Sequence, residues 1–315
     1  MEIKDFNNCT ENMLTYGGHA GAKLGIIIDG ENWFLKFPKS TRTLRKKVDM
    51  SYSTSPLSEY IGSHIYESID IPVHKTMLGI RDNKLVVACK DFRKDISKIT
   101  FEDYNSIYNI YVSGLDEKLS SITSSSNHTV DLNEIMIIME NNPRFINTEG
   151  LKDRFWDMFI VDALIGNNDR NNGNWGVLIN NDTKKVEIAP VFDNGASFGN
   201  NTDDLKIEKI LSDKEKFENS AYLSRICAFS INDKIINPFK YIESLENDEC
   251  NKALLRIVPK IDLSKIYDII NDIPNEYEGI KVISDIRKKY YFECIKYRYE
   301  KSLYKTYLEL LEKNK

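Results

Sequence analysis

Apolar and polar positions in the first part of the chain follow the pattern of short strands separated by tight turns. Residues 24–28 form an apolar run, Asp29-Gly30 follows, and a second run covers residues 33–37, which predicts a hairpin. A similar pattern predicts another hairpin over residues 77–89. Between the two hairpins, residues 59–69 carry apolar side chains at helical spacing and predict a helix.

Beyond residue 92 the pattern becomes mainly helical. An amphipathic stretch covers residues 103–118, a strongly apolar helix is predicted over 152–165, and a last helix over 281–312. Only residues 175–192 again predict a hairpin. We therefore expect an α+β fold with two lobes, a small β-rich lobe in residues 1–92 and a larger helical lobe in 93–315. Small-ligand pockets favour such interfaces.

Composition narrows the function classes. The 315 residues are 29% charged and 41% hydrophobic, ordinary values for a globular protein. A net charge of −5 argues against a direct nucleic-acid binder, and no apolar run is long enough for a membrane span. Five scattered cysteines predict reduced thiols, and the start of the chain lacks an apolar signal segment. We expect a cytoplasmic protein, with a secreted effector as the alternative.

The polar loop at residues 166–174 carries the most informative pair of side chains. Asp169 and Asn174 are separated by the spacing D-x-x-x-x-N of a kinase catalytic loop. In that chemistry the carboxylate orients the attacking hydroxyl and accepts its proton, while the amide oxygen reaches Mg²⁺. The alternative is an Asn/Asp-rich turn whose side chains cap local backbone groups.

A second acidic residue follows the next hairpin. Asp193 leaves the end of an apolar strand and is followed by Gly195, a form that resembles the kinase D-F-G element. Because Mg²⁺ prefers hard oxygen ligands, Asn174 and Asp193 form a coherent pair of candidate metal ligands. An ordinary turn explains Asp193 equally well by itself, but two such turns joined by one short hairpin are less expected by chance.

The first hairpin carries a lysine that needs a partner. Lys36 interrupts the apolar run at 33–37, and an ammonium group in the middle of an apolar strand requires a counter-charge. Glu59, at the start of the predicted helix, is the candidate partner, in the manner of the lysine–glutamate pair of kinases. The alternative is a lysine that snorkels from an edge strand.

Glycines precede this hairpin. Gly17, Gly18 and Gly21 allow backbone N–H groups to approach phosphates closely, and Lys23 follows them. The stretch is not a Walker A loop. It is a candidate phosphate-binding loop mainly because it precedes the hairpin that contains Lys36.

The histidines indicate no separate site. His64 is predicted to pack within its helix, and neither His74 nor His128 has an evident partner in the sequence.

The order of these elements resembles that of the HipA-like serine/threonine kinases, most closely the compact CtkA-type members that lack the additional N-terminal subdomain of HipA. The matching stretches are Tyr-Gly-Gly at 16–18, Lys-Phe-Pro at 36–38, Ser-Glu-Tyr at 58–60, Val-Val-Ala-Cys-Lys-Asp-Phe at 86–92, Phe-Trp-Asp-Met-Phe at 155–159, Asn-Gly-Asn-Trp-Gly at 172–176 and Ala-Leu-Leu-Arg-Ile at 253–257.

The resemblance implies a bilobal protein-kinase-like fold that binds ATP and Mg²⁺ in the cleft. It assigns the catalytic role to Asp169, metal binding to Asn174 and Asp193, and phosphate contact to Lys36 with the support of Glu59. It places adenine at the connector formed by Ala88, Cys89, Lys90 and Asp91. One departure is Asn171, where relatives usually have histidine, and another is the lack of a serine in the glycine-rich loop at the position that HipA modifies.

The leading hypothesis is an ATP-dependent protein serine/threonine kinase whose substrates include other proteins and the chain itself. One alternative is a lipid or small-molecule kinase, because the fold is distantly related to the phosphoinositide kinases. The other is a silent nucleotide-binding component of a toxin–antitoxin pair, with an antitoxin or regulatory protein as its partner. The combination of Lys36, Asp169, Asn174 and Asp193 argues against a loss of chemistry.

Overall fold

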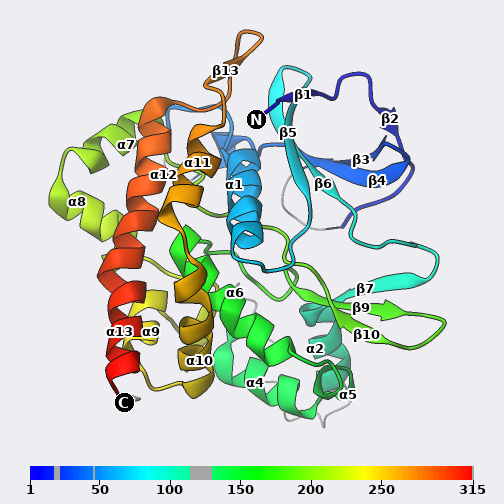
Figure 1. Cartoon of the computed structure of the whole chain (residues 1–315). Coiled ribbons are helices and arrows are strands. Elements are labelled where there is room, and N and C mark those ends of the chain that lie inside the picture. Colours follow the sequence, from blue (N-terminus) through cyan, green and yellow to red (C-terminus); the bar gives the residue numbers. More distant parts are fainter. Residues whose placement is uncertain (18–21, 45–46, 114–129, 314–315) are drawn as a thin grey trace.

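The computed structural model describes residues 1–17, 22–44, 47–113 and 130–313. Figure 1 shows the strand-rich N-terminal part on one side of the molecule and a larger group of helices on the other. A small sheet formed by β7, β9 and β10 lies below the N-terminal sheet, next to the helices. The expected α+β fold with a small β-rich part and a larger helical part is confirmed.

The N-terminal sheet has the strand order β1-β5-β6-β4-β3-β2. Its strands are β1 (Lys4–Asp5), β2 (Thr10–Glu11), β3 (Lys23–Ile28), β4 (Glu31–Lys36), β5 (Thr76–Arg81) and β6 (Lys84–Lys90). Both predicted hairpins are present, because β3 pairs with β4 and β5 pairs with β6 in antiparallel register. The turn at Asp29-Gly30 has φ values of 51° and 76°, which is the backbone expected for a tight hairpin turn.

Helix α1 (Ser55–Ser68) lies against this sheet and begins before the predicted start at Glu59. Pro56 occupies its first turn, where a missing N–H and a fixed φ are tolerated. Glu59 therefore lies within the helix and is buried rather than at its exposed beginning. The short turn η1 (Thr41–Thr43) precedes the helix.

The middle of the chain departs from the expected helical pattern. Strand β7 (Ile99–Asp103) pairs with β9 (Gly176–Asn180), which also pairs with β10 (Val186–Ile188). The predicted hairpin after the polar loop at residues 166–174 is confirmed, but β7 was missed, because its partner lies far along the sequence. Helix α2 (Tyr104–Ser113) covers the described part of the predicted helix over 103–118.

The remaining helices are α4 (Leu132–Asn141), α5 (Pro143–Ile146), α6 (Leu151–Ile165), α7 (Asp204–Leu211), α8 (Lys214–Glu218), α9 (Pro238–Ser244), α10 (Asp248–Ile257), α11 (Leu263–Asn271), α12 (Asp285–Arg298) and α13 (Tyr304–Lys313). Single turns η2 (Asn219–Leu223), η3 (Val258–Lys260) and η4 (Tyr299–Leu303) join some of them. The predicted terminal helix over 281–312 is thus α12, η4 and α13 in succession.

Short strands that were not predicted also occur among these helices. They are β8 (Val130–Asp131), β11 (Phe229–Ile231), β12 (Lys234–Ile235), β13 (Glu276–Tyr277) and β14 (Ile280–Lys281). Strands of this length carry too few positions for an alternation to be recognised in the sequence.

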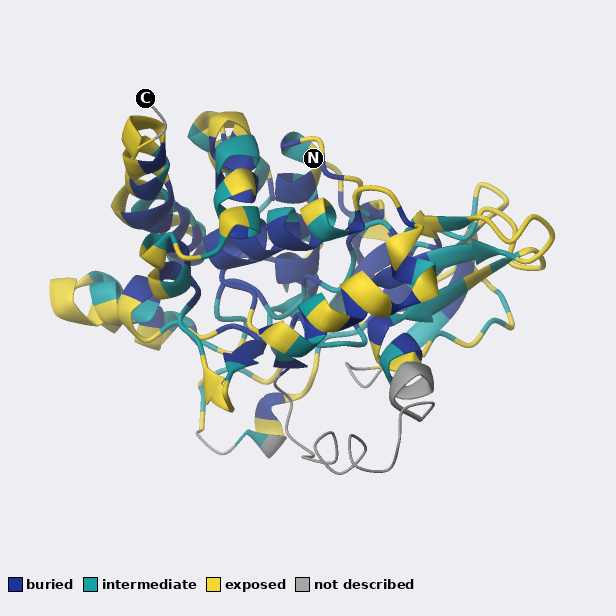
Figure 2. Ribbon diagram, turned by 90° about the horizontal axis from the view of Figure 1, so that it is seen from below, coloured by how far each residue is buried: buried dark blue, intermediate teal, exposed yellow. Residues whose placement is uncertain are grey.

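Helix α6 is the centre of the main hydrophobic core. Almost all of its apolar side chains are buried, and it packs against α10, α12 and α9. Figure 2 shows the buried segments gathered through the middle of the helical part, with exposed residues at the periphery. The same core cluster includes Ile61 of α1 and Leu78 of β5, so it crosses the predicted boundary at residue 92. The loop that follows α6 therefore begins at the centre of the main hydrophobic core.

All five cysteines are free thiols, as predicted. Among the described residues, no helix is both long enough and apolar enough to cross a bilayer.

Candidate functional site

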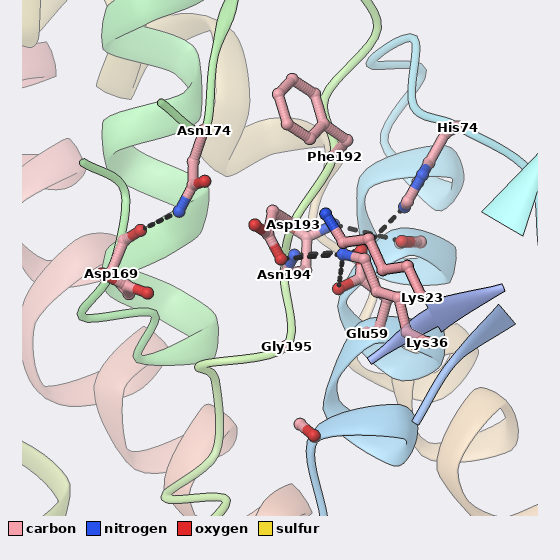
Figure 3. A network of polar contacts seen from close by, with 12 residues as sticks. Lys23, Lys36, Glu59, His74, Asp169, Asn174, Phe192, Asp193, Asn194 and Gly195 are labelled. Carbon is pink, nitrogen blue, oxygen red and sulfur yellow. Dashed lines mark hydrogen bonds and ion pairs between the residues drawn. The ribbon is translucent and has the colours of Figure 1, made fainter. Parts of the chain in front are cut away.

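Lys36 stands at the end of β4, on the face of the sheet that is turned toward α1. Its Nζ atom lies 2.8 Å from Oε2 of Glu59 and 2.8 Å from Oδ1 of Asp193. Only 7% of Lys36 and 1% of Glu59 are exposed. The predicted pairing of the strand lysine with the helix glutamate is confirmed, and the same ammonium group also reaches the candidate metal ligand Asp193 (Figure 3).

Burial and charge act in opposite directions on this ion pair. Burial by itself lowers the pKa of Lys36, but the carboxylates of Asp193 and Glu59 more than offset it and raise that pKa. For Glu59, burial raises the pKa, while Lys36 and His74 hold it below its usual range. The stability that the pair contributes is therefore present across neutral pH. It is lost only as the pH falls through the lowered pKa of Glu59 or rises through the raised pKa of Lys36.

Asp193 adopts a left-handed backbone conformation with φ of 60°. Such a conformation is uncommon outside glycine and costs about 1–3 kcal/mol, so the surrounding structure must hold it. The N–H of Asn194 donates a hydrogen bond of 3.1 Å to Oε1 of Glu59, and the N–H of Val191 donates one of 2.8 Å to the carbonyl of Pro72. The strained residue is therefore fixed on both sides, with its carboxylate directed at Lys36.

The catalytic-loop candidates follow α6 directly. Gly166 ends the helix with φ of 68°, a conformation that favours glycine. The N–H of Asp169 donates to Oδ1 of Asn167 at 3.1 Å, and Nδ2 of Asn174 donates to the carbonyl of Asp169 at 2.5 Å. The amide of Asn174 is thus oriented by its nitrogen. In Figure 3, Asp193 lies between two groups of side chains. Asp169 and Asn174 are on its left, and Lys36 is on its right.

Asn171, which departs from the family pattern, contacts the candidate catalytic carboxylate. Its Nδ2 donates to Oδ1 of Asp169 at 2.9 Å, and its Oδ1 accepts from the N–H of Gly173 at 2.9 Å. The asparagine therefore supplies a neutral hydrogen bond to one oxygen of Asp169 and leaves the other oxygen for a further partner.

Arg170 is a buried residue that forms hydrogen bonds with several segments of the site. It was not identified from the sequence. It is 1% exposed, and Asp162 of α6 binds it in a bidentate pair with distances of 2.8 and 3.0 Å. The same guanidinium donates to the carbonyl of Asn174 at 3.0 Å, to Oδ1 of Asn194 at 2.6 Å and to the carbonyl of Phe192. Burial lowers its pKa, but Asp162 more than offsets this and raises it. An arginine in a polar loop is expected to be exposed, so the sequence offered no signal for this role.

Lys23 lies opposite Lys36 in the β3–β4 pair, so both lysines project from the same face of the hairpin. Burial lowers the pKa of Lys23, and the neighbouring Lys36 adds to this effect. The Nζ atom of Lys23 donates to the carbonyl of Gly17, the one glycine of the predicted loop that the structure describes. Gly18 and Gly21 lie outside the described residues. The two lysines form a positive face that suits an anionic ligand.

Tyr16, at the start of the glycine-rich stretch, lies near the connector. Its ring stacks on Phe34 with centroids 4.5 Å apart, and the guanidinium of Arg93 lies 6.0 Å from its centroid. Burial and the nearby carboxylate of Asp91 raise the pKa of Tyr16 to about 12. Tyr16 and Phe34 therefore form an aromatic pair beside the predicted connector.

The first two connector residues face opposite sides of the sheet. Ala88 lies in the outer apolar cluster with Trp33 and Leu35, away from Lys36. Cys89 lies opposite Phe34 and is fully buried on the side of Glu59. A contact from Ala88 to a nucleotide is thus restricted to its backbone.

Lys90 and Asp91 already use their side chains and N–H groups within the chain. Lys90 pairs with Glu31 at 2.5 Å, and Asp91 pairs with Arg93 at 2.7 Å. Their N–H groups donate to backbone carbonyls, namely those of Lys75 (2.9 Å) and Asn32 (2.9 Å). While these bonds hold, the N–H groups of Lys90 and Asp91 are unavailable to adenine. Their assignment to the nucleotide site stays a prediction.

The expectation that His74 has no partner is wrong. Its Nε2 atom lies 2.8 Å from Oε1 of Glu59, and its backbone N–H donates to the carbonyl of Val191. His64 packs as predicted, with its ring 4.0 Å from that of Tyr60, and His128 lies outside the described residues. Only folding brings the segment before β5 next to α1, so a sequence pattern could not reveal the contact of His74.

The chain is similar in sequence to known proteins. A family profile described as the HipA-like C-terminal domain matches residues 17–240. The serine/threonine-protein kinase CtkA of Helicobacter pylori is 35% identical over 276 residues, which are 87% of this chain and 80% of that protein.

Solved structures extend the likeness to the whole fold. The crystal structure of the H. pylori proinflammatory kinase CtkA matches with a TM-score of 0.85 and 32% identity, over 99% of this chain and 98% of that one. HipA of Shewanella oneidensis, in a complex with HipB and operator DNA, matches with a TM-score of 0.55 and 13% identity. That match covers 96% of this chain and 68% of HipA, and at this identity it shows the fold alone.

Proposed function

The chain belongs to the HipA-like family and is a kinase, and from this premise we propose that it transfers the γ-phosphoryl group of ATP, with Mg²⁺, to serine or threonine hydroxyl groups of proteins, itself included. A cytoplasmic location and an antitoxin or regulatory partner remain predictions that accompany this proposal.

The contact of Lys36 with both Glu59 and Asp193 carries the proposal. In kinases the strand lysine, the helix glutamate and the metal-binding aspartate must be in place together for phosphoryl transfer. Lys36, Glu59 and Asp193 are our candidates for these three residues, and Lys36 contacts each of the two carboxylates at 2.8 Å. An ion pair that served stability alone would not need a strained aspartate beside the loop that contains Asp169.

The side chains of this site fit Mg²⁺ and a triphosphate. Asn174 and Asp193 offer an amide oxygen and a carboxylate, the hard donors that Mg²⁺ prefers. Because Nδ2 of Asn174 is held by the carbonyl of Asp169, its Oδ1 is left for such a role. Lys23 and Lys36 provide positive charge on the facing sheet. When bound, Mg²⁺ would neutralise the charge that develops on the transferred group.

The roles of the chain's own residues follow from these positions. Lys36 would contact the phosphates while Glu59 restrains its ammonium group. Asp169, with one carboxylate oxygen fixed by Asn171, would use the other to orient the acceptor hydroxyl and take its proton. Arg170 holds the carbonyls of Asn174 and Phe192, so that Asp169 and Asp193 keep their relative positions.

Phosphoryl transfer is tested with γ-labelled ATP and Mg²⁺, using the purified protein alone and together with a cell lysate. We expect label on the protein itself and on at least one lysate protein. After acid hydrolysis of these proteins, the label should be recovered as phosphoserine or phosphothreonine. A complete lack of label on any protein, across a range of Mg²⁺ and Mn²⁺ concentrations, would contradict the proposed function.

Lys23→Met tests the positive face of the hairpin. Loss of one charge-assisted phosphate contact of about 1.5 kcal/mol should raise KM for ATP roughly tenfold, with a smaller change in kcat. Lys84→Met, at the start of β6 next to its turn, is the matched control and should leave both parameters unchanged. Steady-state kinetics with a fixed protein acceptor give both values. An unchanged KM for ATP would remove Lys23 from the site.

The lipid or small-molecule alternative is distinguished by the acceptor. The same labelled ATP is offered with mixed phosphoinositide vesicles and with a small-molecule extract. Label that enters lipid or small molecules, with none in protein, would favour that alternative while leaving the assigned site intact.

A further inference from the structure

Three side chains with metal-binding atoms converge behind the kinase ion pair. They are Glu59 of α1, His74 before β5 and Cys89 of β6, and one ligand atom of each lies within 4.8 Å of the others. All of them are buried, with exposed fractions of 1%, 3% and 0%. Of these three side chains, only that of Glu59 has a role in the kinase reaction proposed above; Cys89 enters it only as a residue of the predicted connector.

His74 is the unusual member of this cluster. Its side chain is fully buried with Nε2 2.8 Å from Oε1 of Glu59, while Nδ1 has no hydrogen-bond partner among the described residues. Buried polar atoms normally have partners, and those that do not call for an explanation such as an ion. A buried imidazole nitrogen beside a thiol and a carboxylate is a typical metal-ligand environment.

We propose that Glu59, His74 and Cys89 form a binding site for Zn²⁺, and that Zn²⁺ bound there inhibits the kinase. The inhibitory half of this inference rests on the proposed function, whereas the binding half does not. The site differs from the Mg²⁺ site at Asn174 and Asp193 in the chemistry of its donors.

The donor set determines which metal is expected. A thiolate and an imidazole favour Zn²⁺ and other ions with affinity for sulfur and nitrogen, whereas Mg²⁺ prefers oxygen. With Zn–S of about 2.3 Å and Zn–N or Zn–O of about 2.0–2.1 Å, tetrahedral ligand atoms lie roughly 3.3–3.7 Å apart. Binding therefore requires small shifts of side chains that are now at most 4.8 Å apart. A water molecule would supply the fourth ligand.

Charge and protons balance in this step. Burial raises the pKa of Cys89, so the thiol is protonated before a metal binds. Coordination forms a bond from zinc to sulfur and releases one proton from that thiol, with a neutral His74 and an ionised Glu59 as the other ligands. Beforehand, Lys36, Glu59 and Asp193 sum to −1. Afterwards, two charges from zinc and one from the new thiolate bring the sum to zero. No oxidant or reductant is required.

The consequence for the kinase follows from the bonds that Glu59 makes now. Its Oε2 accepts from Lys36 and its Oε1 accepts from the N–H of Asn194. A zinc ion that takes Oε1 competes with Asn194, and its positive charge weakens the attraction between Glu59 and Lys36. The lysine and the backbone that follows Asp193 both lose their support, and phosphoryl transfer falls.

Binding is tested first, without reference to catalysis. Co²⁺ replaces Zn²⁺ as a spectroscopic probe, because a thiolate ligand gives an intense sulfur-to-cobalt charge-transfer absorption. The full-length wild type is expected to show this absorption with one equivalent of Co²⁺, and Zn²⁺ should abolish it. Cys89→Ser and His74→Phe should weaken the absorption or remove it. Cys9→Ser removes the partly exposed thiol that a stray ion would find first, and it should retain the signal.

Inhibition is tested second, with autophosphorylation or a protein acceptor. We expect Zn²⁺ to inhibit the wild type and Cys9→Ser alike, and a chelator to restore activity. The rate of each variant at each Zn²⁺ concentration is compared with its own metal-free rate. Inhibition of Cys89→Ser should require at least about tenfold more Zn²⁺, because loss of a metal ligand lowers metal affinity at least as much as loss of a residue that hydrogen-bonds to a ligand. Excess Mg²⁺ should not relieve the inhibition.

The outcomes separate the two halves. A wild type without thiolate-to-cobalt absorption overturns the site, whatever the variants do. Absorption that persists in Cys89→Ser but is lost in Cys9→Ser also overturns it, because the ion is then at Cys9. Inhibition that Mg²⁺ relieves, and that Cys89→Ser leaves unchanged, places zinc at Asn174 and Asp193 and overturns the inhibitory half. Cobalt binding as expected in a protein that transfers no phosphate would contradict the proposed function while the metal site stands.

Discussion

Replacing Asp169 by asparagine is expected to abolish phosphoryl transfer and to leave nucleotide binding intact. Asparagine preserves the size of the side chain and the hydrogen bond from Asn171 has an acceptor in the amide oxygen, but the amide cannot accept a proton from the attacking hydroxyl. General-base catalysis contributes about 10²–10⁴ in rate, so a loss of roughly a thousandfold in kcat is expected.

Label transfer under single-turnover conditions measures this loss, and calorimetry with a non-hydrolysable ATP analogue measures binding. Asp182→Asn, in the exposed turn after β9, is a matched control that should behave as wild type. A D169N variant that transfers phosphate at nearly the wild-type rate would show that another residue orients the hydroxyl. A variant that transfers nothing and also fails to bind nucleotide would indicate that Asp169 is needed to hold the loop.

Local sequence patterns predicted the elements whose causes are themselves local. The hairpins were predicted because Asp29-Gly30 and Asp82-Asn83 follow apolar runs, and these turn residues have the positive φ values that such turns require. Glu59 was named as the candidate partner of Lys36 because an ammonium group in an apolar strand needs a counter-charge and kinases pair their strand lysine with a helix glutamate.

The parts of the site that were missed depend on contacts between distant segments. Arg170 is one residue from Asp169, yet its burial depends on Asp162 and Asn194, which reach it only after α6 and the segment beyond β10 have packed together. His74 reaches Glu59 for the same kind of reason. A charged residue in a polar loop gives no sign in the sequence that it will be enclosed, because charged residues in loops are usually exposed.

The resemblance to a known family supplied roles that spacing alone could not. Asp169 and Asn174 are compatible with a polar turn, and in the structure they do make turn-like bonds, such as that from Nδ2 of Asn174 to the carbonyl of Asp169. A polar turn and a catalytic loop are therefore not exclusive alternatives, because the same local bonds would orient these side chains for catalysis. Mutations must decide whether Asp169 acts on the acceptor hydroxyl while Asn174 and Asp193 bind the metal.

Arg170→Met is expected to have the largest effect on stability of any single change at the site. It leaves the buried carboxylate of Asp162 without a counter-charge and removes the donors to the carbonyls of Asn174 and Phe192. Breaking a buried ion pair by removing one partner costs about 3–5 kcal/mol, because an uncompensated charge stays inside the protein. Denaturant unfolding followed by circular dichroism should show a loss of this size in the free energy of unfolding.

A second variant separates charge from packing. Asp162→Asn combined with Arg170→Met removes both charges, so the double variant should be more stable than Arg170→Met alone. Arg256→Met is the matched surface control, since Arg256 also pairs with a carboxylate of α6, at 2.8 Å from Asp157, but its side chain is 35% exposed. That change should cost about 1 kcal/mol or less. If Arg170→Met were as mild as Arg256→Met, the enclosed guanidinium would not be what holds Asn174 and Phe192 in place, and another contact would have to fix the catalytic loop against the backbone before Asp193.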